Sequence, residues 1–217
     1  GIRDIGVTGV QTCALPIYLA AAPALFDQMI FRPLRPLLAQ GPMLGINGDH
    51  DTLWNGGRAL AAEMGWPGNA DRSVQRYGHL AFITLGVEAD SADLPFLRDA
   101  LARTQGAAMR WVVVHRPPAS GNPVLPVVRA AGVAAVLSGH NHRYERRTVD
   151  GVTCLTVGTG GAPRSEGSEF TPESPDAAVS LAEFGALRAD YAAGRTEFAF
   201  IDAAGAVRDR FATPAAG

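Results

Sequence analysis

Two short runs of continuously apolar residues constrain the fold of this chain more than any other feature. Residues 111–114 (WVVV) and 133–137 (VAAVL) show no alternation of polar and apolar positions, as expected for parallel strands that are covered on both faces. Residues 123–131, between them, have the pattern of a short helix that Gly132 ends. A strand, a helix and a second strand in this order predict an α/β unit with a parallel sheet.

The flanking segments add further predicted elements. Residues 22–40 carry a helical apolar stripe, which Pro33 and Pro36 should divide into two short pieces. We expect a helix after Pro95 and another over 176–193. Expected strands are 43–47, 73–77, 80–87 and the segments RYERRTV, VTCLTV, EFAFID and AVRDRF. The sequence therefore predicts one domain that is α/β first and mostly β later.

Composition excludes several classes of protein. The chain has 217 residues, enough for one domain with a substantial core. Its net charge is −2 and it has no basic stripe, so it lacks the charge pattern of a nucleic-acid-binding protein. No apolar run approaches the roughly 20 residues of a membrane span. Cys13 and Cys154 allow at most one bridge, which excludes a disulfide scaffold.

The first seventeen residues do not fit the rest of the chain. The segment 7–17, VTGVQTCALPI, resembles the translation of a widely used short-read sequencing adapter. Artefactual segments are set aside before a fold is considered. The alternative interpretation is an ordinary N-terminal strand and turn. We expect residues 1–17 to be non-native and native sequence to begin near Tyr18.

Four of the five histidines gather in three polar clusters, each just after a predicted strand. The clusters are Asp49-His50-Asp51, His115 and His140-Asn141-His142. Strand ends of an open α/β sheet form the crevice in which such folds bind ligands. Imidazoles and carboxylates gathered there indicate a hydrolytic metal centre.

The spacing within the clusters supports metal binding. His140 and His142 would lie on one side of the chain if its backbone is extended there, and Gly139 permits a sharp turn before them. Asp49 adds a carboxylate that suits iron, manganese or zinc. Two ions about 3.5–4 Å apart can promote the displacement of a phosphoryl group.

At this point the residues match a family. The segments GPMLGINGDHD, WVVVHRPPAS and VLSGHNHRYER resemble the calcineurin-like metallophosphoesterases, especially the branch related to purple acid phosphatases. That family has five blocks, and the last three (G-N-H-(D/E), a lone His, and G-H-x-H) are matched here in order. The resemblance covers the chain from Tyr18 to its end, and it implies layered β-sheets flanked by helices.

The resemblance implies two metal ions of iron, manganese or zinc. Asp49, His115 and His140 would bind the second ion, and His142 would bind the first. The family has Asn where this chain has Asp49; an anionic ligand should hold the metal more tightly but reduce its Lewis acidity.

Catalytic roles also follow from the resemblance. His50 would stabilise the transition state or protonate the leaving alkoxide, and Asp51 would orient His50 through a hydrogen bond. Arg116 would contact the phosphate of a small phosphorylated substrate, or serve in a surface ion pair. His79 has no partner motif and is interpreted as structural, and Cys154 as a core residue.

The D-x-H block and the G-D-x-x-(D/Y) block have no counterpart here. They should lie upstream of Tyr18, so residues 18–217 would be the C-terminal part of a single metallophosphoesterase domain whose first strands are missing. The segment GDHD could also be matched to the G-D-x-x-(D/Y) block. The helix and strand expected before GDHD oppose this match, because in the family a helix normally lies between the second and third blocks. We expect this polypeptide to be unstable or inactive although its parent is active, and robust hydrolysis of p-nitrophenyl phosphate by residues 18–217 with Mn²⁺ would refute this.

Three functional hypotheses remain open. The first is hydrolysis of phosphate monoesters or diesters at a dinuclear centre. The second is a non-catalytic binding domain that retains the fold, which Asp49 in place of Asn favours. The third is a mononuclear zinc hydrolase built on Asp49, His115 and His140, which leaves His142 unused. Relatives of the purple acid phosphatase branch are often exported, but the sequence does not fix the compartment or the oligomeric state.

Overall fold

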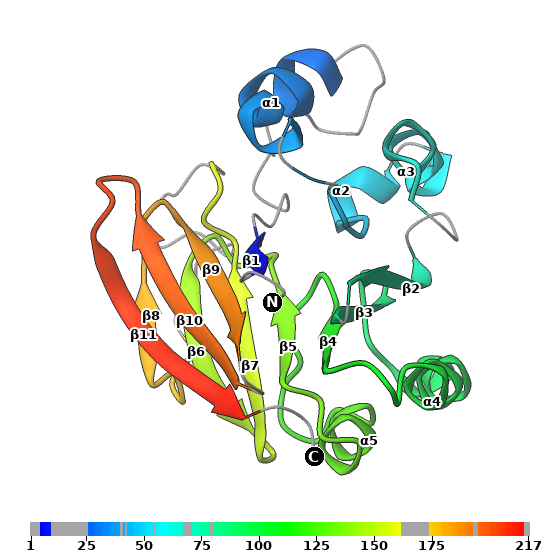
Figure 1. Ribbon diagram of the computed structural model, residues 1–217. Coiled ribbons are helices and arrows are strands. Elements are labelled where there is room, and N and C mark those ends of the chain that lie inside the picture. Colours follow the sequence, from blue (N-terminus) through cyan, green and yellow to red (C-terminus); the bar gives the residue numbers. More distant parts are fainter. Residues whose placement is uncertain are drawn as a thin grey trace.

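The chain folds into two β-sheets that lie against each other, with helices around the larger one (Figure 1). The computed structural model describes residues 5–9, 26–39, 41, 43–53, 55–66, 71–78, 80–161, 174–192 and 195–214. Among the helices of these residues, none is both long and apolar enough to cross a membrane. The predicted α/β class, with layered sheets flanked by helices, is confirmed.

Within the described part of the chain, the larger sheet has seven strands in the order β2-β3-β4-β5-β7-β6-β8. Its centre is parallel, because β3 pairs with β4, β4 with β5, and β5 with β7 in parallel register. β2, β6 and β8 pair antiparallel with their neighbours. The strands are β2 (Arg72–Tyr77), β3 (Leu80–Leu85), β4 (Met109–Val113), β5 (Ala135–Ser138), β6 (Tyr144–Val149), β7 (Val152–Val157) and β8 (Val179–Leu181).

The smaller sheet is antiparallel, in the order β1-β9-β10-β11. Its strands are β1 (Ile5–Gly9), β9 (Gly185–Ala192), β10 (Arg195–Asp202) and β11 (Val207–Pro214). β1 overlaps the adapter-like segment 7–17 at residues 7–9 and pairs along β9. The other residues of 1–17 lie outside the described part of the chain.

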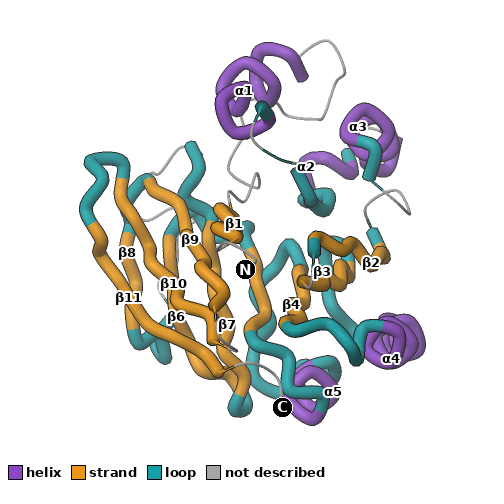
Figure 2. Tube along the Cα trace, in the orientation of Figure 1, coloured by secondary structure: helices purple, strands orange, loops and turns teal. Residues whose placement is uncertain are grey.

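Two helices, α4 (Leu94–Arg103) and α5 (Leu125–Ala130), cover the face of the large sheet that points away from the small one (Figure 2). The N-terminal part forms a separate group with its own small core around Ile30 and Leu60. This group consists of η3 (Asp27–Phe31), α1 (Arg32–Leu38), α2 (Asp49–Thr52), η4 (Asn55–Gly57) and α3 (Arg58–Met64). Outside the group, a 3₁₀ turn, η6 (Ser91–Asp93), precedes α4.

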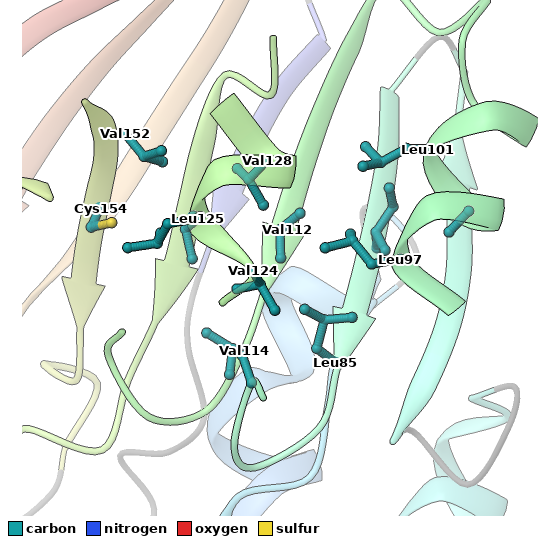
Figure 3. Packing of buried hydrophobic residues seen from close by; sticks show 14 of the residues in the cluster. Leu85, Leu97, Leu101, Val112, Val114, Val124, Leu125, Val128, Val152 and Cys154 are labelled. Carbon is teal, nitrogen blue, oxygen red and sulfur yellow. The ribbon is translucent and has the colours of Figure 1, made fainter. Parts of the chain in front are cut away.

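Alternate residues of the central strands pack into two different hydrophobic cores, one on each face of the large sheet. Val112 and Val114 point toward α4 and α5, where they pack with Leu97 and Val124 (Figure 3). Trp111 faces the small sheet, against the ring of Phe198 at 5.8 Å between centroids. Both faces of the strand are therefore buried, which explains its continuously apolar sequence.

A polar contact joins the two sheets beside the second core. Asp209 of β11 accepts hydrogen bonds from the Tyr144 hydroxyl (2.7 Å) and from Arg146 Nε (2.8 Å), both on β6. Burial by itself would raise the pKa of Asp209, but the bonds from Arg146 and Tyr144 outweigh burial and lower it. The carboxylate is therefore ionised at neutral pH and ties β11 to β6.

Two predicted elements were wrong. Residues 43–47 form no strand; the Gly45 carbonyl accepts from Gln75 Nε2 (3.0 Å) and the Met43 carbonyl from Trp66 Nε1 (3.0 Å). Side chains thus supply hydrogen bonds that a neighbouring strand would otherwise give. The predicted helix over 176–193 is replaced by β8 and β9, since pairing with β6 and β10 overrides the helical propensity of its alanines.

The first predicted helix is divided, but not as expected. A π-helical turn, η3, runs directly into α1 at Arg32, ahead of Pro33. Pro33 lies in the first turn of α1, where a missing N–H is tolerated, and Pro36 lies inside the helix without ending it. Residues 22–25 and 40 of the predicted helix lie outside the described residues, as does His79.

Candidate metal centre

Asp49 opens α2 immediately after a close approach of the backbone to His115. A Cβ on Gly48 would lie 2.9 Å from Cε1 of His115, so only glycine fits here without displacement. The Gly48 N–H donates to the Asp51 carboxylate at 2.7 Å. This bond fixes the turn that carries Asp49 toward the imidazole.

His115 follows β4 and is almost completely buried. Its backbone N–H donates to the Gly86 carbonyl (2.9 Å), and its own carbonyl accepts from the Gly139 N–H (2.9 Å). The loops after β3, β4 and β5 are therefore held to one another by backbone hydrogen bonds. The ends of three parallel strands, β3, β4 and β5, meet at this edge of the sheet. The strand ends before His115 and His140 were predicted, whereas the strand expected before Asp49 is absent.

The loop that bears His140 and His142 has an unusual backbone. His140 has a φ of +61°, in the left-handed region, and the Asn141 N–H donates across it to the Gly139 carbonyl at 2.6 Å, which closes a γ-turn. A similar bond spans His142, from the Arg143 N–H to the Asn141 carbonyl (2.7 Å). The backbone is therefore not extended here, contrary to the condition on which the two imidazoles were expected to share a side.

Gly158 lies against this loop from the end of β7. Its N–H donates to the Arg143 carbonyl at 3.1 Å, and a Cβ at position 158 would overlap the carbonyl oxygen of Asn141. Gly158 therefore packs directly against the backbone of the loop that bears His140 and His142.

Asp49, His115 and His140 meet at one point. Asp49 Oδ1 lies 2.9 Å from His115 Nε2, and Asp49 Oδ2 lies 3.2 Å from His140 Nδ1. The two imidazole nitrogens are 3.3 Å apart. All three ligand atoms lie within 4.8 Å of one another, and the group could hold a metal ion. One carboxylate and two imidazoles are a donor set that fits iron, manganese or zinc.

The electrostatics of the group keep Asp49 anionic. Hydrogen bonds with His115 and His140 hold the pKa of Asp49 far below its usual range, and the bond from Arg116 adds to this; burial opposes the shift but is outweighed. An ionised carboxylate beside two imidazoles is the protonation state that a metal ligand needs.

The other predicted site residues lie around this group without joining it. His142 is buried, and the cluster of candidate ligands found among the described residues does not include it. Nδ1 of His50 is buried and has no hydrogen-bond partner within the described part of the chain, so Asp51 does not bond to that atom. The expected roles of these three residues stay predictions.

Arg116 lies at the rim of the group and contacts two carboxylates. Its Nη2 is 3.1 Å from Asp49 Oδ2, and its Nη1 is 3.1 Å from Glu88 Oε1. Glu88, which stands three residues after β3, was not predicted from the sequence. Only the parallel pairing of β3 with β4 places it beside the residue after His115, and no local pattern signals this.

No family model matches the chain, and a search of curated proteins finds no match. GAP50, the anchor in the inner membrane complex of Plasmodium, aligns at a TM-score of 0.56 and 16% identity, over 81% of this chain and 67% of that chain. A predicted phosphoesterase from Streptococcus pneumoniae aligns at 0.43 and 13%, over 98% and 99%. Vps29 from Entamoeba histolytica, complexed with Zn²⁺, aligns at 0.42 and 15%, over 86% and 76%. The likeness to GAP50 shows a shared fold.

Proposed function

We propose that this chain carries the metal centre of a metal-dependent phosphoesterase of the calcineurin-like type, related to the purple acid phosphatase branch. The observation that supports this most is the meeting of Asp49, His115 and His140, which come from the start of α2 and from the loops after β4 and β5. These are the residues to which the motif resemblance assigns one metal ion. The proposed reaction is hydrolysis of a phosphate monoester or diester in a small phosphorylated substrate.

Each residue contributes in a way that its environment supports. Asp49 supplies an anionic oxygen, and His115 and His140 supply the nitrogens that already face it. A bound ion would supply Lewis acidity toward the phosphate ester. His50, next to Asp49 in the chain and with a buried Nδ1 that lacks a described partner, would hold or donate a proton to the leaving group.

The number of ions is part of the proposal. A dinuclear centre would use His142 for the other ion, together with ligands that the described residues do not supply as a group. The mononuclear zinc hydrolase is favoured by one observation, namely that the three-residue group excludes His142. Equilibrium dialysis with Mn²⁺ or Zn²⁺ separates the two by a stoichiometry of two ions or one.

A non-catalytic binding domain is the alternative from another functional class. Asp49 stands where the resembled family has Asn, and GAP50, which shares the fold, is described as an anchor. Metal binding alone does not separate this alternative from the enzyme. Phosphate binding that depends on metal does, because a hydrolytic centre must hold the phosphoryl group at the ion.

The test is calorimetric titration of the full chain, first with Mn²⁺ and then with inorganic phosphate. Asp49→Ala should abolish both binding events, whereas the matched control Asp99→Ala, an exposed carboxylate on α4 paired with Arg103, should change neither. Phosphate binding that is absent from the metal-loaded chain would leave the binding domain as the function. The relative rates of hydrolysis of p-nitrophenyl phosphate and bis(p-nitrophenyl) phosphate would separate monoesterase from diesterase, and robust turnover by the chain itself would refute the expectation that it is inactive.

A further inference from the structure

The guanidinium of Arg116 is shared between a candidate metal ligand and a residue that faces solvent. Nη2 contacts Asp49 Oδ2 and Nη1 contacts Glu88 Oε1, both at 3.1 Å. The Glu88 side chain is 60% exposed, whereas that of Asp49 is 25% exposed. The guanidinium therefore has an inner acceptor at the metal centre and an outer one at its rim.

The backbone keeps the outer acceptor in place. The Arg116 N–H donates to the Val87 carbonyl at 2.9 Å, and the His115 N–H donates to the Gly86 carbonyl at 2.9 Å. These bonds hold the loop after β4 against the loop after β3, up to the residue before Glu88. The contact between Arg116 and Glu88 therefore joins two loops whose backbones are already bonded to each other.

The inner acceptor is an atom that a metal ion would also require. Asp49 Oδ2 accepts from Arg116 and also lies 3.2 Å from His140 Nδ1. An arginine stays charged at every physiological pH. A cation bound by Asp49 and His140 would therefore compete with the guanidinium for the same carboxylate oxygen, and the two positive charges would repel each other.

We propose that Arg116 is an internal cation that neutralises Asp49 in the metal-free protein, and that Glu88 is the alternative acceptor to which its guanidinium turns when a metal ion binds. The inference rests on the proposed metal centre. In this arrangement Arg116 lowers the affinity for metal, and Glu88 restores part of it by drawing the guanidinium away from Asp49. Both are positioning residues, because they act on the ion through Asp49.

Mn²⁺ affinity of the full chain, measured by calorimetric titration, tests the proposal. Arg116→Gln should tighten Mn²⁺ binding about tenfold, equivalent to about 1.4 kcal/mol. Glu88→Gln should weaken it about threefold, the scale of one exposed ion pair. The double variant should bind like Arg116→Gln, because Glu88 acts through Arg116. Arg103→Gln, which removes an exposed arginine from α4, should leave the affinity unchanged.

The double-mutant comparison decides between this device and a general effect of charge. Equal weakening by Glu88→Gln with and without Arg116 would overturn the proposal, since bulk electrostatics alone predicts it. Unchanged or weaker binding in Arg116→Gln would overturn it as well. A failure of the proposed function looks different: the unmodified chain would then bind no Mn²⁺, whereas a failure of this inference leaves its binding intact. Circular dichroism of each variant confirms that it is folded.

Discussion

The left-handed backbone of His140 predicts an inverted order of stability between two substitutions. A residue with a Cβ at φ +61° costs roughly 1–2 kcal/mol relative to an ordinary conformation. Glycine avoids that cost but loses roughly 0.5–1 kcal/mol more backbone freedom on folding. His140→Gly should therefore be more stable than His140→Ala by about 0.5–1 kcal/mol. Both variants lose the same imidazole, so its contacts with Asp49 and His115 cancel in the comparison.

Urea denaturation with EDTA present measures this difference without any contribution from metal. The two variants must have equal m-values, so that a shift in midpoint reports stability alone. His142, in the same loop but without a positive φ, is the matched control. At position 142 alanine should be more stable than glycine, which is the usual order.

An alanine variant as stable as the glycine variant at position 140 would refute the reasoning. A glycine variant that is more stable than the alanine variant would mean that the chain keeps a histidine in a strained conformation at some cost in stability. Strain of this kind is concentrated at functional sites. It would therefore support a role for the imidazole of His140 beyond packing.

Three further predictions concern the surroundings of the site and the core. Gly158→Ala should lower the free energy of unfolding by about 2 kcal/mol, as overpacking does, and should also weaken Mn²⁺ binding. Gly106→Ala, where a Cβ meets nothing, should change neither quantity. Urea denaturation measures the stability, and titration calorimetry measures the Mn²⁺ affinity. The fold lowers the pKa of Asp209 from 3.8, so the stability that its ionised carboxylate contributes is present above about pH 4 and is lost as the pH falls further. The unfolding free energy of Asp209→Asn should therefore fall less steeply between pH 7 and pH 3 than that of the unmodified chain. Burial raises the pKa of the Cys154 thiol to about 11, so this thiol should react slowly with a disulfide reagent at pH 8. In a Cys13→Ser background, the reaction should be slow with the native chain and fast in urea. Equal rates in the two conditions would contradict this prediction.

Strands that are buried on both faces were predictable from the sequence. The run at 111–114 and its counterpart at 133–137 correspond to β4 and β5, which pair in parallel as expected. Apolar residues on both faces of a strand leave a short, continuously apolar run, and the helix and glycine between the two runs favoured strands over buried helix segments. The helix between them, α5, followed from its apolar spacing and the glycine after it.

The errors arose where tertiary context decides the structure. An alanine-rich segment became β9 because the neighbouring strand offered a complete register of partners. Residues 43–47 look like a strand in sequence, yet the side chains of Trp66 and Gln75 provide their hydrogen bonds. Neither outcome depends on the segment's own residues, so propensity could not reveal it.

The candidate site was predictable in its members but not in its detailed geometry. His115 and His140 follow β4 and β5 as expected, whereas Asp49 meets them from the start of α2, after a segment that forms no strand. The tight turns at His140 and His142 could not be foreseen, because no local pattern in the sequence signals that the backbone there is not extended. The contact of Arg116 with Glu88 depends on sheet register, which a single sequence does not specify.

The backbone bonds among the loops after β3, β4 and β5 have a consequence for how the site could change over evolution. The N–H and carbonyl groups that join Gly86, His115 and Gly139 are present in every residue except proline, which lacks the N–H. The frame of these loops therefore does not depend on which side chains they present. Positions 115 and 140 could exchange one ligand type for another, and with it the preferred metal, while the loops that carry them stay in place.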